Sequence, residues 1–361
     1  MTRVRGYFSD SYLDARETFL DAARRAKGDL TSFMNPNATG VEDEGLATDL
    51  ARFGPADAEN VLIVNSGTHG VEGYCGSGCQ VGAIQSGLIR ERARNTAIVL
   101  CHAINPYGFS WSRRVNEDNV DLNRNFVDHE AGHPDNPAYR EVHGFIAPAD
   151  WAGPGRAAAD KAMEAFIAER GEVAFQAAVT GGQYEFPKGL FYGGQAPVWS
   201  NVTFREVVRR AGRGRRRIAL IDLHTGLGPS GHGELIYSGA ESEPGYHRAT
   251  AWFGEAHSTK AGRSVSAVVM GDITEAVPSE LPEAEYTAVA LEFGTVPMLQ
   301  VLDALRADNW LYAYGDPKSS LGKQIRAQTR AAFYVDDDTW KSQVFTRASE
   351  VIRQALSALG A

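Results

Sequence analysis

Three side chains that follow apolar runs have the types that bind zinc. His69 and Glu72 lie in the glycine-flanked segment SGTHGVEG, directly after an apolar run that ends at Asn65, and His224 ends a second apolar run. Zinc accepts imidazole nitrogen and carboxylate oxygen, and three protein ligands leave a fourth position for a water whose pKa falls to about 7. The pattern therefore predicts a hydrolytic zinc site. Taken singly, the same residues also fit solvated loop side chains or a hydrogen-bonded histidine at a strand end.

Glu292 is a candidate general base. It is the charged residue of the apolar run Thr287–Phe293, where a carboxylate is costly unless it is paired or functional. A water activated by a metal needs a group that accepts its proton. A buried glutamate paired with an arginine is the alternative, but the nearby metal ligands favour the base.

The polar segment 113–126 carries candidate substrate-binding residues. A buried carboxylate such as Asp121 can hold a ligand histidine in the correct tautomer. The neighbouring arginines suit two tasks, which are stabilisation of a carbonyl oxyanion and bidentate binding of an anionic group. Read in isolation, the segment is more typical of a solvated polar loop.

These motifs occur in one order along the chain. His69-x-x-Glu72 is followed by NPYG, by Arg114 ahead of DLNRNF, by DLHTG and by LEF, over residues ~60–295. This order resembles the zinc carboxypeptidase (carboxypeptidase A-like) superfamily. The segments SGTHGVEG, HAINPYGF and DLHTGLG look more like an uncharacterised bacterial branch, labelled as a domain of unknown function, than like the digestive enzymes.

The resemblance implies one Zn²⁺ ion held by His69, Glu72 and His224. It implies that Glu292 activates the water and later protonates the leaving amine. The implied reaction is a carboxypeptidase-type cleavage of an amide bond next to a free carboxylate, with a small peptide or acyl-amino-acid as substrate. Two alternatives stay open: an aspartoacylase-like or desuccinylase-like deacylase of N-acyl amino acids, which shares these motifs, and a catalytically silent zinc- or carboxylate-binding protein.

The resemblance also implies how the substrate is held. Arg114 would stabilise the carbonyl oxyanion, with Arg113 as an adjacent alternative that the spacing to the DLNR motif disfavours. Asn123 and Arg124 would bind the terminal carboxylate, and Asp121 would support the first histidine ligand. The digestive enzymes also place a mobile tyrosine over the substrate, and among Tyr237, Tyr246 and Tyr286 the sequence does not single one out.

The elements that must position these residues alternate between strands and helices, which predicts an α/β fold. Short buried runs predict the strands Asn60–Asn65, Thr96–Ile104, Arg217–Leu223 and Thr287–Phe293. Helices are predicted at Ser9–Ala26, Gly78–Ala93, Ala157–Val179, Phe204–Ala211, Pro244–Lys260, Val296–Ala313, Leu321–Phe333 and Thr339–Leu359. We expect a mixed, mainly parallel twisted sheet with helices on both faces, in the carboxypeptidase-like (phosphorylase/hydrolase-like) architecture that the resemblance implies.

Residues drawn from 69 to 292 must meet at one metal, so we expect a single domain over residues 1–361, with helical flanks around the motif core. The glycine- and aromatic-rich segment Gly181–Asn201 either covers the substrate or is pinned to the core by its aromatic side chains. The sequence leaves the oligomeric state open.

The amino-acid composition limits the classes of molecule that this protein is expected to bind. The 361 residues are 43% hydrophobic and carry a formal net charge of −9, which disfavours nucleic acid as a partner despite the arginine-rich run 209–217. Three cysteines in so long a chain fit a reducing compartment. The N-terminus lacks the apolar region of a signal peptide and no long apolar run follows, so we expect a cytoplasmic protein with no membrane partner.

Overall fold

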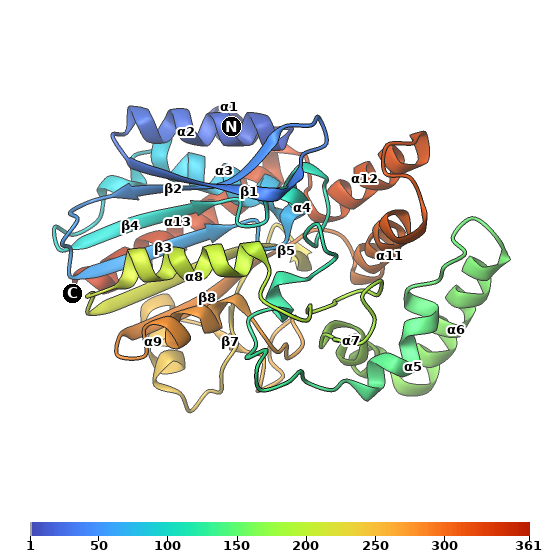
Figure 1. The fold of residues 1–361 in the computed structure, drawn as a ribbon. Coiled ribbons are helices and arrows are strands. Elements are labelled where there is room, and N and C mark those ends of the chain that lie inside the picture. The colour runs from blue at the N-terminus through green and yellow to red at the C-terminus, as the bar shows by residue number, and fades with distance from the viewer. Residues whose placement is uncertain (1) are drawn as a thin grey trace.

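The computed structural model describes residues 2–361 and is built around a mixed sheet (Figure 1). Within these residues the sheet has eight strands in the order β1-β2-β4-β3-β5-β8-β6-β7. The strands are β1 Asp29–Thr39, β2 Gly45–Phe53, β3 Asn60–Ser66, β4 Thr96–His102, β5 Arg217–Ser230, β6 Gly233–Tyr237, β7 His257–Ser258 and β8 Glu285–Gly294. The four central strands β4, β3, β5 and β8 are parallel, and β2 and β6 pair antiparallel with them. The predicted mainly parallel α/β sheet is confirmed.

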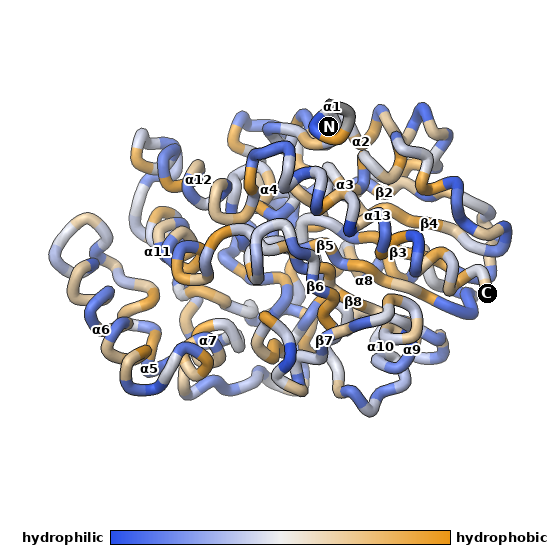
Figure 2. Tube along the Cα trace, turned by 180° about the vertical axis from the view of Figure 1, so that it is seen from behind, coloured by the Kyte–Doolittle hydropathy of each residue, from blue (hydrophilic) through white to orange (hydrophobic). Residues whose placement is uncertain are grey.

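The four predicted strands are these central ones, because continuous apolar runs are typical of strands buried on both faces. Successive β3 residues face opposite layers: Val61 and Ile63 pack in one hydrophobic cluster, and Leu62 and Val64 in the other. Figure 2 shows hydrophobic stretches along the central strands, with more hydrophilic ones in the outer loops. The outer strands β1, β2, β6 and β7 were not predicted.

Helices cover both faces of the sheet. Figure 1 shows α8 in front of the sheet, while α3 and α13 lie behind it. The helices are α1 Thr2–Arg5, α2 Tyr12–Arg25, α3 Gly73–Gln85, α4 Pro106–Ser110, α5 Pro137–Ile146, α6 Pro154–Arg170, α7 Glu172–Thr180, α8 Trp199–Gly212, α9 Pro244–Phe253, α10 Ala276–Glu280, α11 Met298–Tyr314, α12 Ser320–Phe333 and α13 Asp338–Gly360. Helices α5, α6, α7, α11 and α12 lie beyond one end of the sheet (Figure 1).

Three helices were predicted to continue too far, and glycine explains where they stop. The predicted Ala157–Val179 is two helices, α6 and α7, separated at Gly171. In place of the predicted Pro244–Lys260, helix α9 ends at Phe253, directly before Gly254. In place of the predicted Gly78–Ala93, helix α3 begins at Gly73 and ends at Gln85, near Gly87. All three glycines have positive φ, between 80° and 85°, which interrupts a right-handed helix.

Among residues 2–361, no helix combines the length and the apolar character needed to cross a bilayer.

Candidate metal centre and pocket

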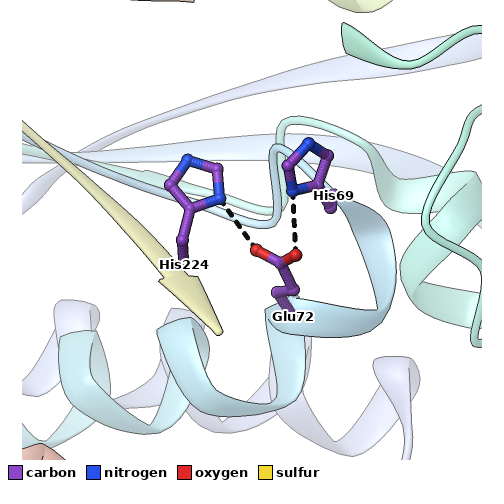
Figure 3. A group of neighbouring side chains, drawn as sticks. All are labelled: His69, Glu72 and His224. Atoms are coloured by element: carbon purple, nitrogen blue, oxygen red, sulfur yellow. Dashed lines mark hydrogen bonds and ion pairs between the residues drawn. The ribbon is translucent and has the colours of Figure 1, made fainter. Parts of the chain in front are cut away.

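His69, Glu72 and His224 come together where the parallel strands end. The chain leaves β3 at Ser66, passes His69 and forms a 3₁₀ turn, Gly70–Glu72, whereas His224 lies within β5. His69 Nδ1 lies 2.8 Å from Glu72 Oε1, and His224 Nδ1 lies 2.8 Å from Glu72 Oε2. Figure 3 shows both imidazole rings directed at the one carboxylate. The three residues are buried, their ligand atoms lie within 4.8 Å of one another, and the group could hold a metal ion.

The charge around this group suits a cation. Burial favours the neutral form of Glu72, but the two facing imidazoles bring its pKa down to about 2. Burial also opposes protonation of His224, yet the carboxylates of Asp222 and Glu72 raise its pKa well above the usual value. The three buried residues thus offer two imidazole nitrogens and one ionised carboxylate oxygen close together. This set of donors fits zinc.

Each histidine has a second carboxylate on its far side. His224 Nε2 lies 2.6 Å from Asp222 Oδ2, and His69 Nε2 lies 3.3 Å from Asp121 Oδ1. Asp222 is fixed in turn by Asn65 Nδ2 and Thr68 Oγ1, each 2.8 Å from its Oδ1. The sequence analysis assigned no role to Asp222. The available signal was its place two residues before His224 on a strand, which puts both side chains on the same face.

Glu292 lies beside His224, because the two residues are register partners on the parallel strands β5 and β8. Its Oε1 accepts the backbone N–H of Leu227 at 2.8 Å. Burial and the neighbouring Glu72 raise its pKa to about 7. Among residues 2–361 no arginine or lysine donates a hydrogen bond to Glu292, and Arg114 acts on its carboxylate only through its charge, so the structure does not support the salt-bridged alternative.

Arg114 and Arg124 flank Asp121. Arg114 Nε donates to Asp121 Oδ2 at 2.9 Å, and its Nη1 lies 3.5 Å from Glu72 Oε1. Arg124 Nη1 lies 3.3 Å from Asp121 Oδ1, while its Nη2 donates to the carbonyl of Thr180. Burial opposes ionisation of Asp121, but the two arginines and His69 hold its pKa well below the usual value. Arg124 Nε is buried and has no hydrogen-bond partner among residues 2–361.

Asn123 and the aromatic ring of Phe191 complete this side of the site. Asn123 Oδ1 accepts the N–H of Ile273 at 3.2 Å. Phe191 comes from the segment Gly181–Asn201, and its ring centre lies 5.3 Å from the guanidinium carbons of Arg114 and Arg124. The metal-ligand group, Glu292, both arginines, Asn123 and Phe191 all line one pocket.

Several alternatives considered from the sequence lie elsewhere. Arg113 turns away from the pocket: its Nε lies 3.1 Å from Asp308 Oδ2 and its guanidinium stacks on Tyr312. Tyr237 donates to Glu243 and Tyr246 to Glu241. Neither of these tyrosines nor Tyr286 lines the pocket. The loop 264–272 contributes lining residues there instead, and it contains no tyrosine.

Residues 8–347 match the family described as "Protein of unknown function (DUF2817)". The chain belongs to this family. No curated protein is significantly similar to this chain in sequence.

Solved structures similar to this DUF2817 protein confirm the predicted carboxypeptidase-like fold. Carboxypeptidase A from Helicoverpa armigera is 11% identical, with 90% of this chain and 74% of that chain covered and a TM-score of 0.50. Bovine thrombin-activatable fibrinolysis inhibitor, solved with tick carboxypeptidase inhibitor, is 12% identical, with 98% of both chains covered and a TM-score of 0.54. Succinylglutamate desuccinylase from Chromobacterium violaceum is 15% identical over 87% of this chain and 73% of that chain, and its TM-score of 0.38 is too low to bear on the fold.

Gly70 lets the turn Gly70–Glu72 of this DUF2817 protein pack closely against helix α4 and the backbone of Arg114. Its N–H donates to the Arg114 carbonyl at 3.0 Å, and a Cβ at this position would lie 2.0 Å from the backbone carbonyl carbon of Gly108. We therefore expect Gly70→Ala to lower the free energy of unfolding by about 2–3 kcal/mol and to weaken metal binding. Gly144→Ala is the matched control, because a Cβ there meets nothing within 4 Å on helix α5. Chemical denaturation of both variants gives the comparison, and equal stabilities would contradict this account.

Proposed function

We propose that this protein is a zinc-dependent hydrolase that cleaves an amide bond next to a free carboxylate, as a carboxypeptidase-type enzyme. One observation carries the proposal: the buried group His69, Glu72 and His224 shares a pocket with Glu292 and with two arginines. A metal-ligand set, a carboxylate of raised pKa and fixed positive charge are the parts that amide hydrolysis needs.

A zinc ion held by the three ligands would supply a water of lowered pKa and would polarise the substrate carbonyl. Glu292 would be the acceptor for a proton of that water; its Oε1 already accepts the Leu227 N–H, which orients the carboxylate. The water oxygen bonds to the carbonyl carbon, the C–N bond breaks, and Glu292 returns the proton to the departing amine nitrogen. In the metal-free protein, burial and Glu72 raise the pKa of Glu292 to about 7, and a carboxylate that can both take up and release a proton suits the two transfers.

The arginines divide the binding of substrate between them. Arg114 uses Nε on Asp121, and its guanidinium, which lines the pocket, stabilises the negative charge that develops on the carbonyl oxygen. Arg124 has a buried Nε without a partner, and an unsatisfied buried donor of this kind is costly unless a ligand pairs with it. We assign the free carboxylate of the substrate to Arg124, together with the Asn123 amide.

Metal analysis and a substrate panel test the proposal. We expect about one zinc ion per chain after purification and hydrolysis of short peptides or N-acyl amino acids. The same amides with their carboxylate blocked as a methyl ester are the control and should be cleaved at least tenfold more slowly, because Arg124 then lacks its partner. A zinc-loaded protein that cleaves none of these amides would support the silent binding protein instead.

We also propose a cytoplasmic protein that acts on small molecules rather than on nucleic acid. The arginine-rich run supports this in part, since some of its side chains are engaged within the fold: Arg209 pairs with Glu280, and Arg217 donates to the carbonyl of Leu359. The three cysteines are free and buried, which agrees with a reducing compartment.

A further inference from the structure

The pocket extends from Glu292 along an apolar wall that the proposed chemistry does not use. Helix α11 contributes Met298, Val301, Leu302 and Leu305 to the lining. Their spacing of three, four and seven residues places them on one face of the helix. Helix α11 therefore presents a continuous apolar stripe to the pocket.

The apolar wall begins next to the catalytic carboxylate. The Cβ position of Gly226 lies 3.1 Å from the Phe333 ring and 3.6 Å from Glu292 Oε1, so the ring and the carboxylate are neighbours. Phe175 and Val179 of helix α7 add further apolar surface to the lining. Any substrate whose amide reaches Glu292 thus meets hydrocarbon side chains.

Another part of the lining is polar. Asn123 and Arg124 lie there with Asp272 and Ser238, and Ser238 Oγ donates to Asp272 Oδ2 at 3.2 Å. A carboxylate held by Arg124 would occupy this polar part, and the stripe on α11 would then be left for an apolar part of the substrate. The lining thus matches a molecule with one charged end and one apolar end.

Exposed apolar side chains lie on the same pocket-lining segments. Val173 of α7, Val268 and Met270 of the loop 264–272, and Leu299 of α11 are 82%, 46%, 42% and 46% exposed. Helix α7 and this loop are joined by the hydrogen bond from Gln176 Nε2 to the Val265 carbonyl at 2.9 Å. Three of the segments that line the pocket thus also carry exposed apolar side chains, which is compatible with a site for an apolar ligand.

We propose that the pocket binds a large apolar group on the carbonyl side of the scissile amide, against the stripe on α11. The substrate class is then an amide of an apolar acyl group, either a medium-length acyl chain or a bulky aliphatic residue, with an amino acid that keeps its free carboxylate. This inference rests on the proposed function for the position of the amide and the carboxylate.

Binding to the zinc-loaded Glu292→Gln variant tests the inference without turnover. Isothermal titration calorimetry would compare N-acetyl and N-decanoyl derivatives of alanine, phenylalanine and lysine, with acetyl-leucyl derivatives of the same amino acids as a third arm. Each buried methylene favours binding, so we expect the decanoyl or the leucyl compounds to bind at least about 100-fold more tightly than the acetyl ones. Affinities within threefold of one another, or no binding of either apolar series, would overturn the inference.

Two variants locate the apolar group in the same background. Leu302→Gln, and Met298→Gln at a less buried position, should each weaken binding of the apolar compounds about tenfold and change acetyl binding less than twofold. Leu321→Gln is the control, because Leu321 is 43% exposed on α12 and does not line the pocket. Equal losses for acetyl and apolar compounds would overturn the assignment to α11.

Hydrolysis by the wild type is measured separately. Failure to cleave any amide would contradict the proposed function, whereas the binding preference would still decide this inference.

Discussion

Replacement of Glu292 by glutamine is expected to lower kcat for amide hydrolysis by between about 10² and 10⁴-fold, while the protein keeps its zinc. Glutamine has nearly the same shape and can still accept the Leu227 N–H, but it cannot take a proton from water. Glu292 is not one of the three side chains in the metal-ligand group. Zinc content and kcat measured on the same preparation separate loss of the base from loss of the metal.

Although Glu292→Gln should lower kcat, we expect it to raise the stability of the metal-free protein at high pH. Burial raises the pKa of Glu292 from 4.5 to about 7. Between these two pH values, Glu292 is therefore protonated in the folded metal-free protein and ionised in the unfolded chain. The stability that this protonated form contributes is complete below about pH 4.5 and is lost as the pH rises through 7. At pH 8 we therefore expect metal-free Glu292→Gln to be more stable than the metal-free wild type, by about 3 kcal/mol. At pH 4 the difference should vanish.

Glu285→Gln provides the matched control, because Glu285 begins the same strand and is exposed. It should leave kcat, zinc content and the pH dependence of unfolding unchanged. If Glu292→Gln kept full turnover, the assignment of the general base would be wrong. If it lost its zinc, the loss of turnover would no longer identify Glu292 as the base.

The sequence predicted the centre of this molecule better than its periphery. Asn60–Asn65 and Thr287–Phe293 are runs whose burial on both faces leaves little other choice of structure, and both are central strands. Edge strands lack that signature: β1 contains Asn35, Pro36 and Asn37 and is largely exposed. It forms because β2 supplies its hydrogen-bond partners, and no local pattern shows that pairing.

The candidate site shows the same contrast. His224 and Glu292 could be placed together because each lies near the carboxyl end of a predicted parallel strand, and such ends meet at one edge of a sheet. Which of Arg113 and Arg114 faces the pocket depends on the partner of Arg113, Asp308, which is distant in sequence. The stripe on α11 was inside a predicted helix, yet the face that lines the pocket follows only from how that helix packs against the sheet.

Removal of either histidine ligand is expected to abolish both metal and activity. His69→Ala and His224→Ala each take one nitrogen donor from the group around Glu72. Two remaining ligands do not complete a catalytic zinc site, which uses three. We expect less than about 0.1 zinc per chain and a fall in hydrolysis of at least about 10³-fold. Metal analysis after dialysis and kinetics on the best substrate measure the two effects.

Zinc binding should also be visible in the unfolding of the protein. A ligand that binds only the folded state stabilises it in proportion to RT ln(1 + [L]/Kd), so zinc should raise the Tm of the metal-free wild type and leave that of His224→Ala unchanged. Asp222→Asn tests the hydrogen bond behind His224. This variant should retain zinc with about 10- to 100-fold weaker affinity, because the imidazole is less well oriented and less basic.

His232→Ala is the control for these histidine variants. His232 is exposed and lies outside the pocket, so its replacement should change neither zinc content nor the Tm shift. We therefore expect the wild type and His232→Ala to bind zinc most tightly, Asp222→Asn less tightly, and the two ligand variants least. This order follows because His69 and His224 face Glu72 directly, whereas Asp222 contacts only one of these histidines, His224. If His69→Ala or His224→Ala bound zinc as tightly as the wild type, the metal would have to bind elsewhere, and the roles proposed for Glu292 and Arg114 would fall with it.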